Sequence, residues 1–438
     1  MKVSYELKRG LLKFIFTPDN NEGIDYSKKV KMGRYQCEMH MPDDWNLEKI
    51  HPDVLALVAI LIAYPFLDEG IEVPIGVSKS FHDLFSLETQ KFIYPIDKYL
   101  SPRNAPNDSI PGLAYSGGVD STAALSLLPN NTACFFLDRI LPRELEGKLN
   151  LHDKQSVYDA YEYLRKKGRQ EYKIKTDLEY IRSPRGFPVE FSTTIPALLL
   201  SDYVGIDSVA TGTIMEHQFI EHYINFPSRQ YSVNWSNIFA GVEIFLNQVT
   251  VGISEVGAMK IVLNSEYNSL TNSCLKGKGS TPCLKCDKCF RKKLLEMTLL
   301  KQHISDDILN DLFLSTEART MIKKLPISVE NVITYITSHY DGNHKLMNLL
   351  KIRTRGDILD TNWMEKWYAP SKELIADKYC DHIEREIRKH LEFMNEKDEI
   401  NMNNWNINEV IESPIYQEYQ RIFVSQLIKF KQLAKQNK

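Results

Sequence analysis

A glycine-rich turn limits the possible folds of this chain more than any other segment. Residues 113–115 form a short apolar run, residues 116–121 have the sequence SGGVDS, and residues 122–128 follow a helical pattern. Glycine lets the backbone approach a phosphate closely, and amide groups at a helix N-terminus point toward a bound anion. Serine hydroxyls at both ends of the turn add donors, and Asp120 suits Mg²⁺ bound to phosphate oxygens. The segment therefore predicts an anion site between a strand and a helix.

Short apolar runs alternate with helical patterns after this turn, at residues 133–137, 156–166, 172–178, 191–203 and 208–213. Such alternation favours an α/β fold with a doubly wound parallel sheet, whose ligands bind beyond the carboxyl ends of the strands. Asp138 directly follows one predicted strand and is expected to line that cleft. The turn lacks the lysine of a P-loop and the GxGxxG spacing of a dinucleotide fold, so kinase or dehydrogenase chemistry is not expected.

The chain divides into three predicted regions. Residues 1–109 begin with strand-like alternation and end in a turn-rich linker, which predicts an N-terminal α+β accessory region. Residues 110–300 form the predicted α/β domain, and residues 301–438 predict a helical C-terminal region. Both flanks exceed what one small-molecule enzyme requires, so we expect them to bind a partner protein or a second copy of the chain.

Composition narrows the function classes further. The net charge of −3 over 438 residues gives no global attraction to nucleic acid, so a dedicated DNA-binding protein is not expected. The longest apolar run, residues 54–66, is too short to cross a bilayer and predicts a buried helix. The N-terminal residues have no pattern of a secretory signal. We therefore expect a cytoplasmic protein without a membrane partner.

Four of the seven cysteines lie close together in the sequence, with spacing Cys-x8-Cys-x2-Cys-x2-Cys. In a reducing compartment this cluster predicts metal binding before disulfides, and four thiolates suit a closed, structural zinc site. A redox CxxC pair or an iron-sulfur cluster is the alternative. The predicted ligands are Cys274, Cys283, Cys286 and Cys289.

The turn resembles the SGGxDS pyrophosphate loop of the N-type ATP pyrophosphatases, which cleave ATP between the α and β phosphates to adenylate an oxygen atom. Followed by residues 271–274, by residues 282–289 and by Arg291, it is similar to the 7-cyano-7-deazaguanine synthases (QueC-like ligases) over about residues 111–300. The resemblance implies ATP, Mg²⁺ and Zn²⁺ as cofactors, with Asp120 and Ser121 as catalytic residues. It also implies that the ATP-binding residues are Ser116, Gly117, Gly118, Val119, Asp120, Ser121, Asp138 and Gly212.

Enzymes of this family activate a carboxylate as an acyl-adenylate, add ammonia to form an amide, and dehydrate the amide to a nitrile with a second ATP. The strategy is chemically sound because AMP is a far better leaving group than a carboxylate oxygen. The resemblance therefore implies an ATP-dependent, carbon–nitrogen bond-forming ligase. The implied acceptor is a small carboxylate or deazapurine, or a protein or nucleic acid modified in an anti-phage system.

The chain departs from the family at two segments. Residues 211–217 keep the glycine but not the SGYPDCRPEF-like run that follows it in the family, which predicts a changed acceptor. Residues 253–257 carry Glu255 where the family has a phosphate-facing lysine, and Lys260 or Lys276 is the candidate to replace that lysine. Glu216 and His217 follow the fourth predicted strand and serve either the substrate or the structure.

Two alternatives stay open at this point. One is a tRNA-modifying relative that adenylates a base for thiolation or amine ligation, although the chain has no recognisable RNA-binding domain. The other is a scaffold that holds nucleotide without turnover, which the presence of Glu255 favours.

Overall fold

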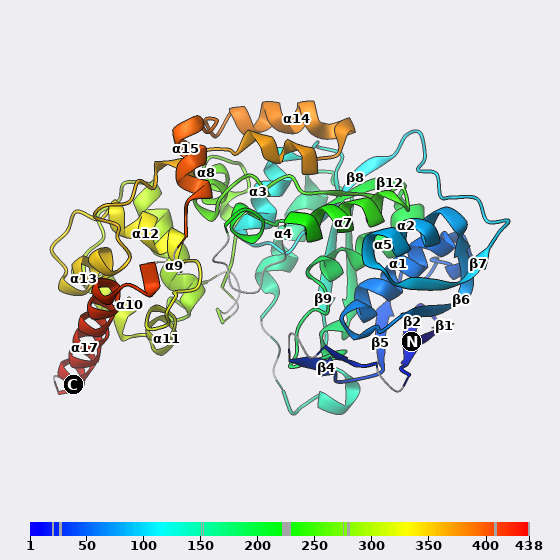
Figure 1. The fold of residues 1–438 in the computed structure, drawn as a ribbon, viewed down its shortest axis with the longest axis horizontal. Helices are drawn as coiled ribbons and strands as arrows, with labels where there is room; N and C mark the ends of the chain where they lie inside the picture. The colour runs from blue at the N-terminus through cyan, green and yellow to red at the C-terminus, as the bar shows by residue number, and fades with distance from the viewer. Residues whose placement is uncertain are drawn as a thin grey trace.

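A ten-stranded, mostly parallel sheet with helices on both faces organises the protein (Figure 1). The computed structural model describes the chain except residues 20–21, 26–28, 150, 152, 221–228, 275, 278–280, 407–409 and 437–438. The strands, in order across the sheet, are β13 (Phe245–Asn247), β12 (Ile206–Ala210), β8 (Ile110–Ala114), β9 (Ala133–Arg139), β10 (Glu171–Thr176), β5 (Gln36–His40), β2 (Leu11–Thr17), β1 (Lys2–Lys8), β6 (Gly70–Ser78) and β7 (Phe92–Asp97). The α/β class predicted from the sequence is confirmed.

The five strands from β13 to β10 are mutually parallel. From β8 the chain proceeds to β9 and β10 on one side of the sheet and then to β12 and β13 on the other side. The order therefore reverses between β8 and β12, and the carboxyl ends of these two strands lie side by side. Ligands of open parallel sheets bind at such a reversal.

Both faces of this sheet are covered, and β9 illustrates why. Its successive side chains alternate between two hydrophobic cores, because neighbouring residues of a strand point to opposite faces. Cys134 and Phe136 enter the core that contains α3 (Val119–Leu127), whereas Phe135 and Leu137 enter the core that contains α1 (Pro52–Ala63). The predicted buried helix is confirmed, since every residue of α1 after Pro52 is buried.

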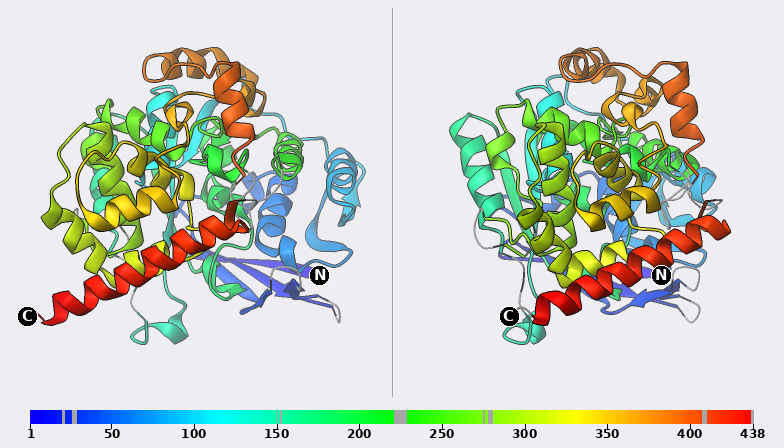
Figure 2. Two further views of the ribbon diagram at one scale, coloured as in Figure 1. Left: turned by 60° about the vertical axis from the view of Figure 1, so that its left-hand side comes forward. Right: turned by 90° about the vertical axis from the view of Figure 1, so that its left-hand side faces the viewer.

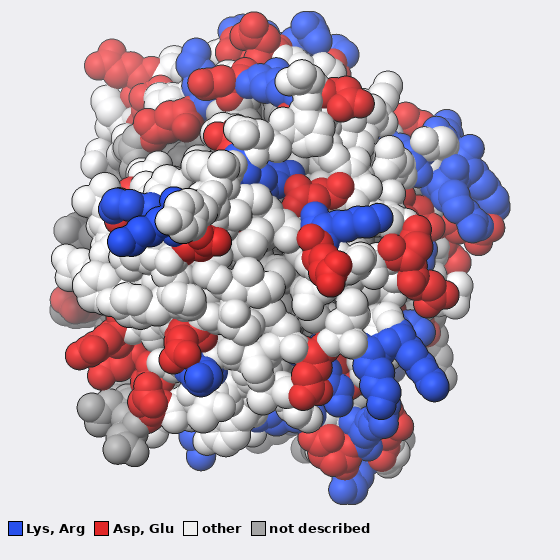
Figure 3. Space-filling model, turned by 90° about the vertical axis from the view of Figure 1, so that its right-hand side faces the viewer, with Lys and Arg blue, Asp and Glu red and all other residues white. Residues whose placement is uncertain are grey.

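The N-terminal region continues the same sheet. Strand β5 pairs antiparallel with β10, β2 and β1 follow antiparallel, and β6 and β7 then add in parallel. A separate three-stranded sheet has the order β11 (Arg182–Ser183), β4 (Val30–Met32) and β3 (Ile24–Asp25). On the face in Figure 3, acidic and basic side chains are interspersed around a broad uncharged area. The described residues of that face thus form no uniform basic surface for a polyanion.

Helices cover the sheet and build most of the C-terminal region. Around the sheet lie α2 (Lys79–Thr89), α4 (Gln155–Lys166), α5 (Ile195–Leu199), α6 (Ser201–Val204), α7 (Arg229–Ala240) and α8 (Glu255–Leu263), and α9 (Asp287–Leu299) packs between α8 and the C-terminal helices. The C-terminal region contains α10 (Asp306–Leu314), α11 (Thr316–Ile322), α12 (Glu330–Ser338), α13 (Lys345–Arg353), α14 (Asp377–Arg388), α15 (Glu396–Asn403) and α17 (Pro414–Gln436). Within the described residues, none of the helices combines the length and apolar character needed to cross a bilayer.

The long helix α17 crosses α13, and its C-terminal end projects from the body of the protein (Figure 2). Phe423 and Leu427 on its inner face are fully buried. Trp363 and Trp367 are fully buried as well, and Trp367 forms backbone bridges to Ile253 and Phe393. These aromatic residues therefore serve packing within the C-terminal region and against the segment that precedes α8.

The C-terminal region packs directly on the end of the parallel sheet. Gly252 lies so close to it that a Cβ atom there would be 1.9 Å from Ser371 Oγ. Lys260 of α8 pairs with Glu365 at 2.8 Å, and the Gln248 amide donates to the Leu374 carbonyl at 3.0 Å. The helices after residue 300 are thus anchored to the segments that surround the candidate site.

Candidate functional site

The glycine-rich turn connects β8 to α3 at the point where the strand order reverses. Gly117 has φ +72°, a left-handed conformation that favours glycine. Gly118 is the N-cap of α3 and, as a glycine, offers no side-chain oxygen to the first turn of the helix. Ser273 Oγ accepts a hydrogen bond from the Val119 amide at 3.3 Å. The start of α3 therefore resembles the helix N-termini that bind anions through backbone amides.

The two serines of the turn face each other. Ser116 Oγ lies 3.2 Å from Ser121 Oγ, and Ser121 Oγ donates to the Gly118 carbonyl at 3.1 Å. The Ser116 amide in turn donates to Ser121 Oγ at 3.4 Å. Ser121 is buried, so its hydroxyl closes the turn internally.

Gly212, at the end of β12, packs against the backbone of the turn. A Cβ atom at this position would lie 2.7 Å from the Ser121 amide nitrogen and 2.9 Å from the Asp120 carbonyl carbon. Such distances require the neighbouring backbone to shift, so glycine is the residue that fits this position without a displacement. The structure thus brings Gly212 and the turn together, as the order of the strands predicts.

Asp138 lies at the end of β9 and is buried. One carboxylate oxygen accepts a hydrogen bond from Lys154 Nζ, and the other accepts from the Tyr158 hydroxyl at 2.9 Å. Burial and this carboxylate together raise the pKa of Tyr158 to about 12. Asp138 therefore fastens the start of α4 to the sheet in the described structure.

A cluster of four charged side chains borders the turn. Glu255, the first residue of α8, is buried and lies 2.8 Å from Arg291 Nε and 3.0 Å from Lys292 Nζ. Lys292 Nζ also lies 3.1 Å from Asp120 Oδ1. Burial alone would favour neutral Glu255, but the two cations outweigh it and lower its pKa to about 2. The cluster therefore places two carboxylates and two cations beside the start of α3.

Lys292 is the basic residue that lies beside the turn, and the sequence alone did not indicate it. Lys260 contacts Glu365, and Lys276 contacts Glu317 at 2.9 Å, so these candidates are directed elsewhere. Lys292 follows the last cysteine by three positions, on a helix that begins within the cysteine cluster. Its position could have been inferred only by expecting that cluster to lie against the turn.

Glu216 lies beneath this charged cluster and is fully buried. Its carboxylate oxygens accept from the Glu255 amide at 3.0 and 3.1 Å, and one accepts from Asn331 Nδ2 at 2.8 Å. Burial raises the pKa of Glu216 to about 6. Because Asn331 belongs to α12, the C-terminal region contributes a direct contact to the site. His217 Nδ1 instead lies 3.6 Å from Glu190.

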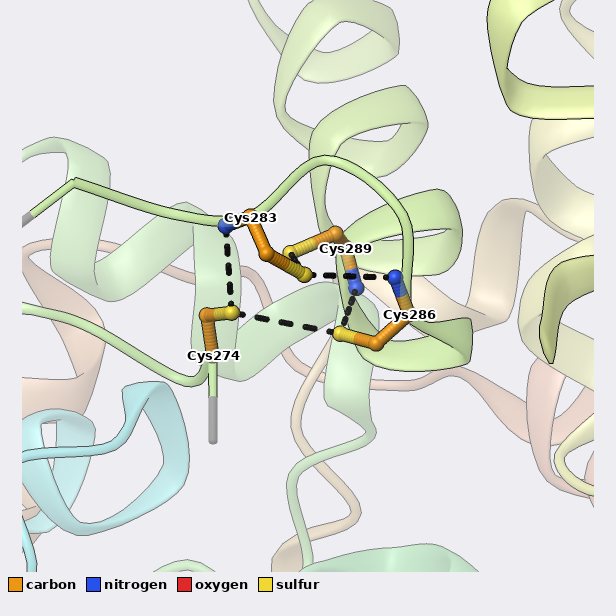
Figure 4. A group of neighbouring side chains, drawn as sticks. All are labelled: Cys274, Cys283, Cys286 and Cys289. Atoms are coloured by element: carbon orange, nitrogen blue, oxygen red, sulfur yellow. Dashed lines mark hydrogen bonds between the residues drawn. The ribbon is translucent and has the colours of Figure 1, made fainter. Parts of the chain in front are cut away.

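The four clustered cysteines form a second centre, in which the sulfur atoms face one another (Figure 4). All four lie within 4.8 Å of one another, with separations of 4.0 Å for Cys274 to Cys286 and 3.8 Å for Cys283 to Cys289. Tetrahedral zinc with Zn–S bonds of about 2.3 Å places its sulfurs about 3.8 Å apart. The predicted grouping is confirmed, and it could hold a metal ion such as zinc.

Backbone amides support these sulfurs. The Cys283 amide donates to Cys274 Sγ at 3.2 Å, the Cys286 amide to Cys283 Sγ at 3.3 Å, and the Cys289 amide to Cys286 Sγ at 3.4 Å. Such contacts stabilise thiolate and orient it toward a metal. The residues fit a closed four-sulfur site better than an open catalytic one.

The cysteine segment is attached to the glycine-rich turn. The Asn272 amide donates to the Gly117 carbonyl at 3.0 Å, beside the contact between Ser273 and Val119. A cavity of about 220 Å³ lies between this segment, α8 and α9. Its lining includes Val119, Ser273, Lys288, Lys292 and Lys293. The cysteine cluster and the turn therefore lie in direct contact beside this cavity.

One family model matches the chain, a family of unknown function (DUF6395), over residues 234–406. The match begins in α7, includes the four cysteines, Glu255 and Lys292, and ends after α15. It covers less than half of the chain and runs across position 300, where the sequence predicts a boundary. The curated proteins contain no match to this chain.

Proposed function

We propose that the chain binds ATP with Mg²⁺ at the turn of residues 116–121 and adenylates an acceptor oxygen, releasing pyrophosphate. The observation that carries this proposal is the start of α3 at the reversal of a parallel sheet, where the N-cap residue Gly118 provides no side-chain hydrogen bond and Gly212 packs on the backbone of the turn. Backbone amides at that point are oriented before any ligand arrives, which favours binding of a polyphosphate. The similarity of SGGVDS to the pyrophosphate loop supports the same assignment.

Five of the six residues of the turn have a proposed role. Asp120 would hold Mg²⁺, because its carboxylate stands at the start of α3 and is 37% exposed. The metal would supply charge neutralisation of the leaving pyrophosphate. Ser116 donates to phosphate oxygens, and Ser121 keeps the turn closed. Gly117 and Gly118 admit the phosphate to the backbone.

The four cysteines are proposed to hold a structural zinc ion. With four sulfur ligands the ion has no open position for water, so it contributes to folding and not to the chemical step. Because residues 272 and 273 contact the turn, the zinc site would fix the wall of the nucleotide site.

We propose a QueC-like carbon–nitrogen ligase as the overall activity, with a carboxylate or related carbonyl oxygen as the acceptor. The turn and the cysteine segment support this class together, since they lie in contact. The segment after β12 lacks the SGYPDCRPEF-like run of the family, which favours an acceptor other than the free deazapurine. A pocket built for hydrogen bonds discriminates between such acceptors by up to about 10⁴-fold.

The test uses the purified full chain with Mg²⁺ and α,β-methylene-ATP for binding, and ATP for pyrophosphate release. Pyrophosphate release is measured in separate reactions with three candidate acceptors: 7-carboxy-7-deazaguanine, a protein extract or bulk tRNA. We expect the wild type to bind the analogue and Asp120→Asn to lose the Mg²⁺-dependent part of binding while keeping its melting temperature. Asp83→Asn, at an exposed carboxylate of α2, should behave as wild type.

The outcomes separate the alternatives. A wild-type chain that does not bind the analogue, or an Asp120→Asn chain that binds it equally well, refutes the nucleotide assignment. Binding without pyrophosphate release in any arm supports the non-catalytic scaffold. Release that requires tRNA supports the tRNA-modifying alternative, and efficient release with the free deazapurine contradicts the changed acceptor.

A further inference from the structure

Lys292 has an unusual position for a lysine. Its side chain is only 11% exposed, and its ammonium group lies between Asp120 at 3.1 Å and Glu255 at 3.0 Å. The helix that carries it, α9, starts in the cysteine cluster, which itself contacts the turn. The ammonium group is thus held at the start of α3 by α9 and the cysteine segment, which lie far from α3 in the sequence.

The charges of the cluster balance without a ligand. Glu255 and Asp120 contribute two negative charges, and Arg291 and Lys292 contribute two positive charges. The Arg291 contact at 2.8 Å already provides Glu255 with a cation. If Asp120 held Mg²⁺, Lys292 would lose one of its two carboxylate partners and would share the other, Glu255, with Arg291. A new anion beside Lys292 would then be favourable.

The space beside Lys292 suits such an anion. Lys292 and Val119, the first residue of α3, both line the cavity of about 220 Å³ between α8, α9 and the cysteine segment. Lys293 also lines this cavity but pairs with Glu296 at 3.3 Å. Lys288 lines the cavity as well, but within the described residues Lys292 is the lysine of this lining that forms an ion pair with the turn, to Asp120 at 3.1 Å.

Buried groups hold Glu255, and through it Lys292, in place. Glu216 accepts from the Glu255 amide, and Asn331 of α12 donates to Glu216. A chain of contacts therefore runs from the C-terminal region through two buried carboxylates to the ammonium group. Such preorganisation reduces the cost of ordering a long side chain when a ligand binds.

We infer that Lys292 binds the β and γ phosphates of the nucleotide and that Glu255 is a positioning residue that holds Lys292 beside the turn. This inference rests on the proposed function, because it assumes that a nucleoside triphosphate occupies the turn. Under this inference Glu255 does not impair nucleotide binding. The acidic side chain instead orients a lysine that another helix supplies.

The competing explanation is that Lys292 only completes a structural ion-pair network. The two explanations differ in their dependence on phosphate number. A residue that contacts the β and γ phosphates affects binding of a triphosphate but leaves binding of AMP unchanged. A structural residue affects both ligands alike, through the shape of the turn.

The experiment compares binding of α,β-methylene-ATP and AMP, each with Mg²⁺, to four full-length proteins by calorimetry. Lys292→Met should weaken triphosphate binding by about 10- to 100-fold, the range of one charge-assisted hydrogen bond. AMP affinity should stay unchanged, and Lys292→Arg should restore part of the loss. Lys389→Met is the control, because Lys389 is an exposed residue at the C-cap of α14 that pairs with Glu386, and it should retain the wild-type preference for triphosphate.

A second variant keeps the inference testable if Lys292→Met does not fold. The double variant Glu255→Gln with Lys292→Met removes one charge of each sign, so the net charge of the cluster stays the same. It too should lose the preference for triphosphate over AMP. If the wild type binds neither ligand, the proposed function itself fails. If the wild type prefers the triphosphate and either lysine-free variant keeps that preference, only the role of Lys292 is refuted.

Discussion

Replacement of Gly212 by alanine tests whether the end of β12 fixes the shape of the glycine-rich turn. The added Cβ would lie 2.7 Å from the Ser121 amide nitrogen, whereas ordinary contact begins at 3.4 Å. The turn must therefore move by about 0.7 Å, and overpacking of this kind costs about 1–3 kcal/mol. For a chain of this length, with an unfolding entropy of about 0.9 kcal/mol per kelvin, the melting temperature should fall by about 1–3 K.

Function should respond more strongly than stability to the same change. A displacement approaching 1 Å at a preorganised site lowers a rate by up to about 100-fold, so we expect Gly212→Ala to reduce pyrophosphate release at least about 10-fold. Hydrogen exchange of peptides that cover residues 116–121 should increase, which gives a readout independent of any acceptor.

Gly118→Ala is the stability control for this prediction. Its Cβ would meet nothing closer than Ser116 Oγ at 3.6 Å, and φ is −82°, so its cost should stay below about 1 kcal/mol. If Gly212→Ala matches the wild type in melting temperature, hydrogen exchange and pyrophosphate release, the close packing of β12 against the turn does not govern the site.

Three further predictions address other parts of the molecule. Metal analysis should find one zinc per chain; Cys286→Ser should lose it and melt lower, whereas Cys380→Ser should keep it, and a zinc-free wild type would contradict the assignment. Glu216 has its pKa raised from 4.5 to about 6, so its contribution to stability is complete below pH 4.5 and is lost as pH rises through 6. Glu216→Gln should therefore gain about 2 kcal/mol relative to the wild type between pH 4.5 and 7.5, and parallel melting curves of the two proteins against pH would disprove this. Gly252→Ala would bring a Cβ within 1.9 Å of Ser371 Oγ, so proteolysis should cut the C-terminal region faster, and unchanged protease resistance would argue against tight docking there.

Local sequence patterns predicted the elements that depend on neighbouring residues. The turn between β8 and α3, the buried helix α1 and the grouping of the four cysteines are encoded within short segments, by glycine spacing, apolar content and cysteine spacing. Each of these features can form from contacts of low sequence separation, so its signal is visible without the rest of the chain.

The features that sequence reasoning missed depend on distant segments. Lys292 reaches Asp120 across 172 positions, and Asn331 reaches Glu216 across 115 positions. The antiparallel pairing of β5 with β10 likewise joins residues 39 and 40 to residues 175 and 176. No local period encodes such a pairing, because register between remote strands is set by the packed faces of the whole sheet.

The pairing of β5 with β10 has a consequence for how the chain can be divided. Residues 1–109 contribute half of one sheet, so their removal would leave β10 as an edge strand and expose the backbone groups of residues 175 and 176 that pair with β5. Exposed edges of this kind recruit other strands and promote aggregation. The linker at residues 101–109 is therefore a place where the backbone can be nicked but the two fragments should not part. We therefore expect separately produced halves, divided at this linker, to complement each other when they are refolded together.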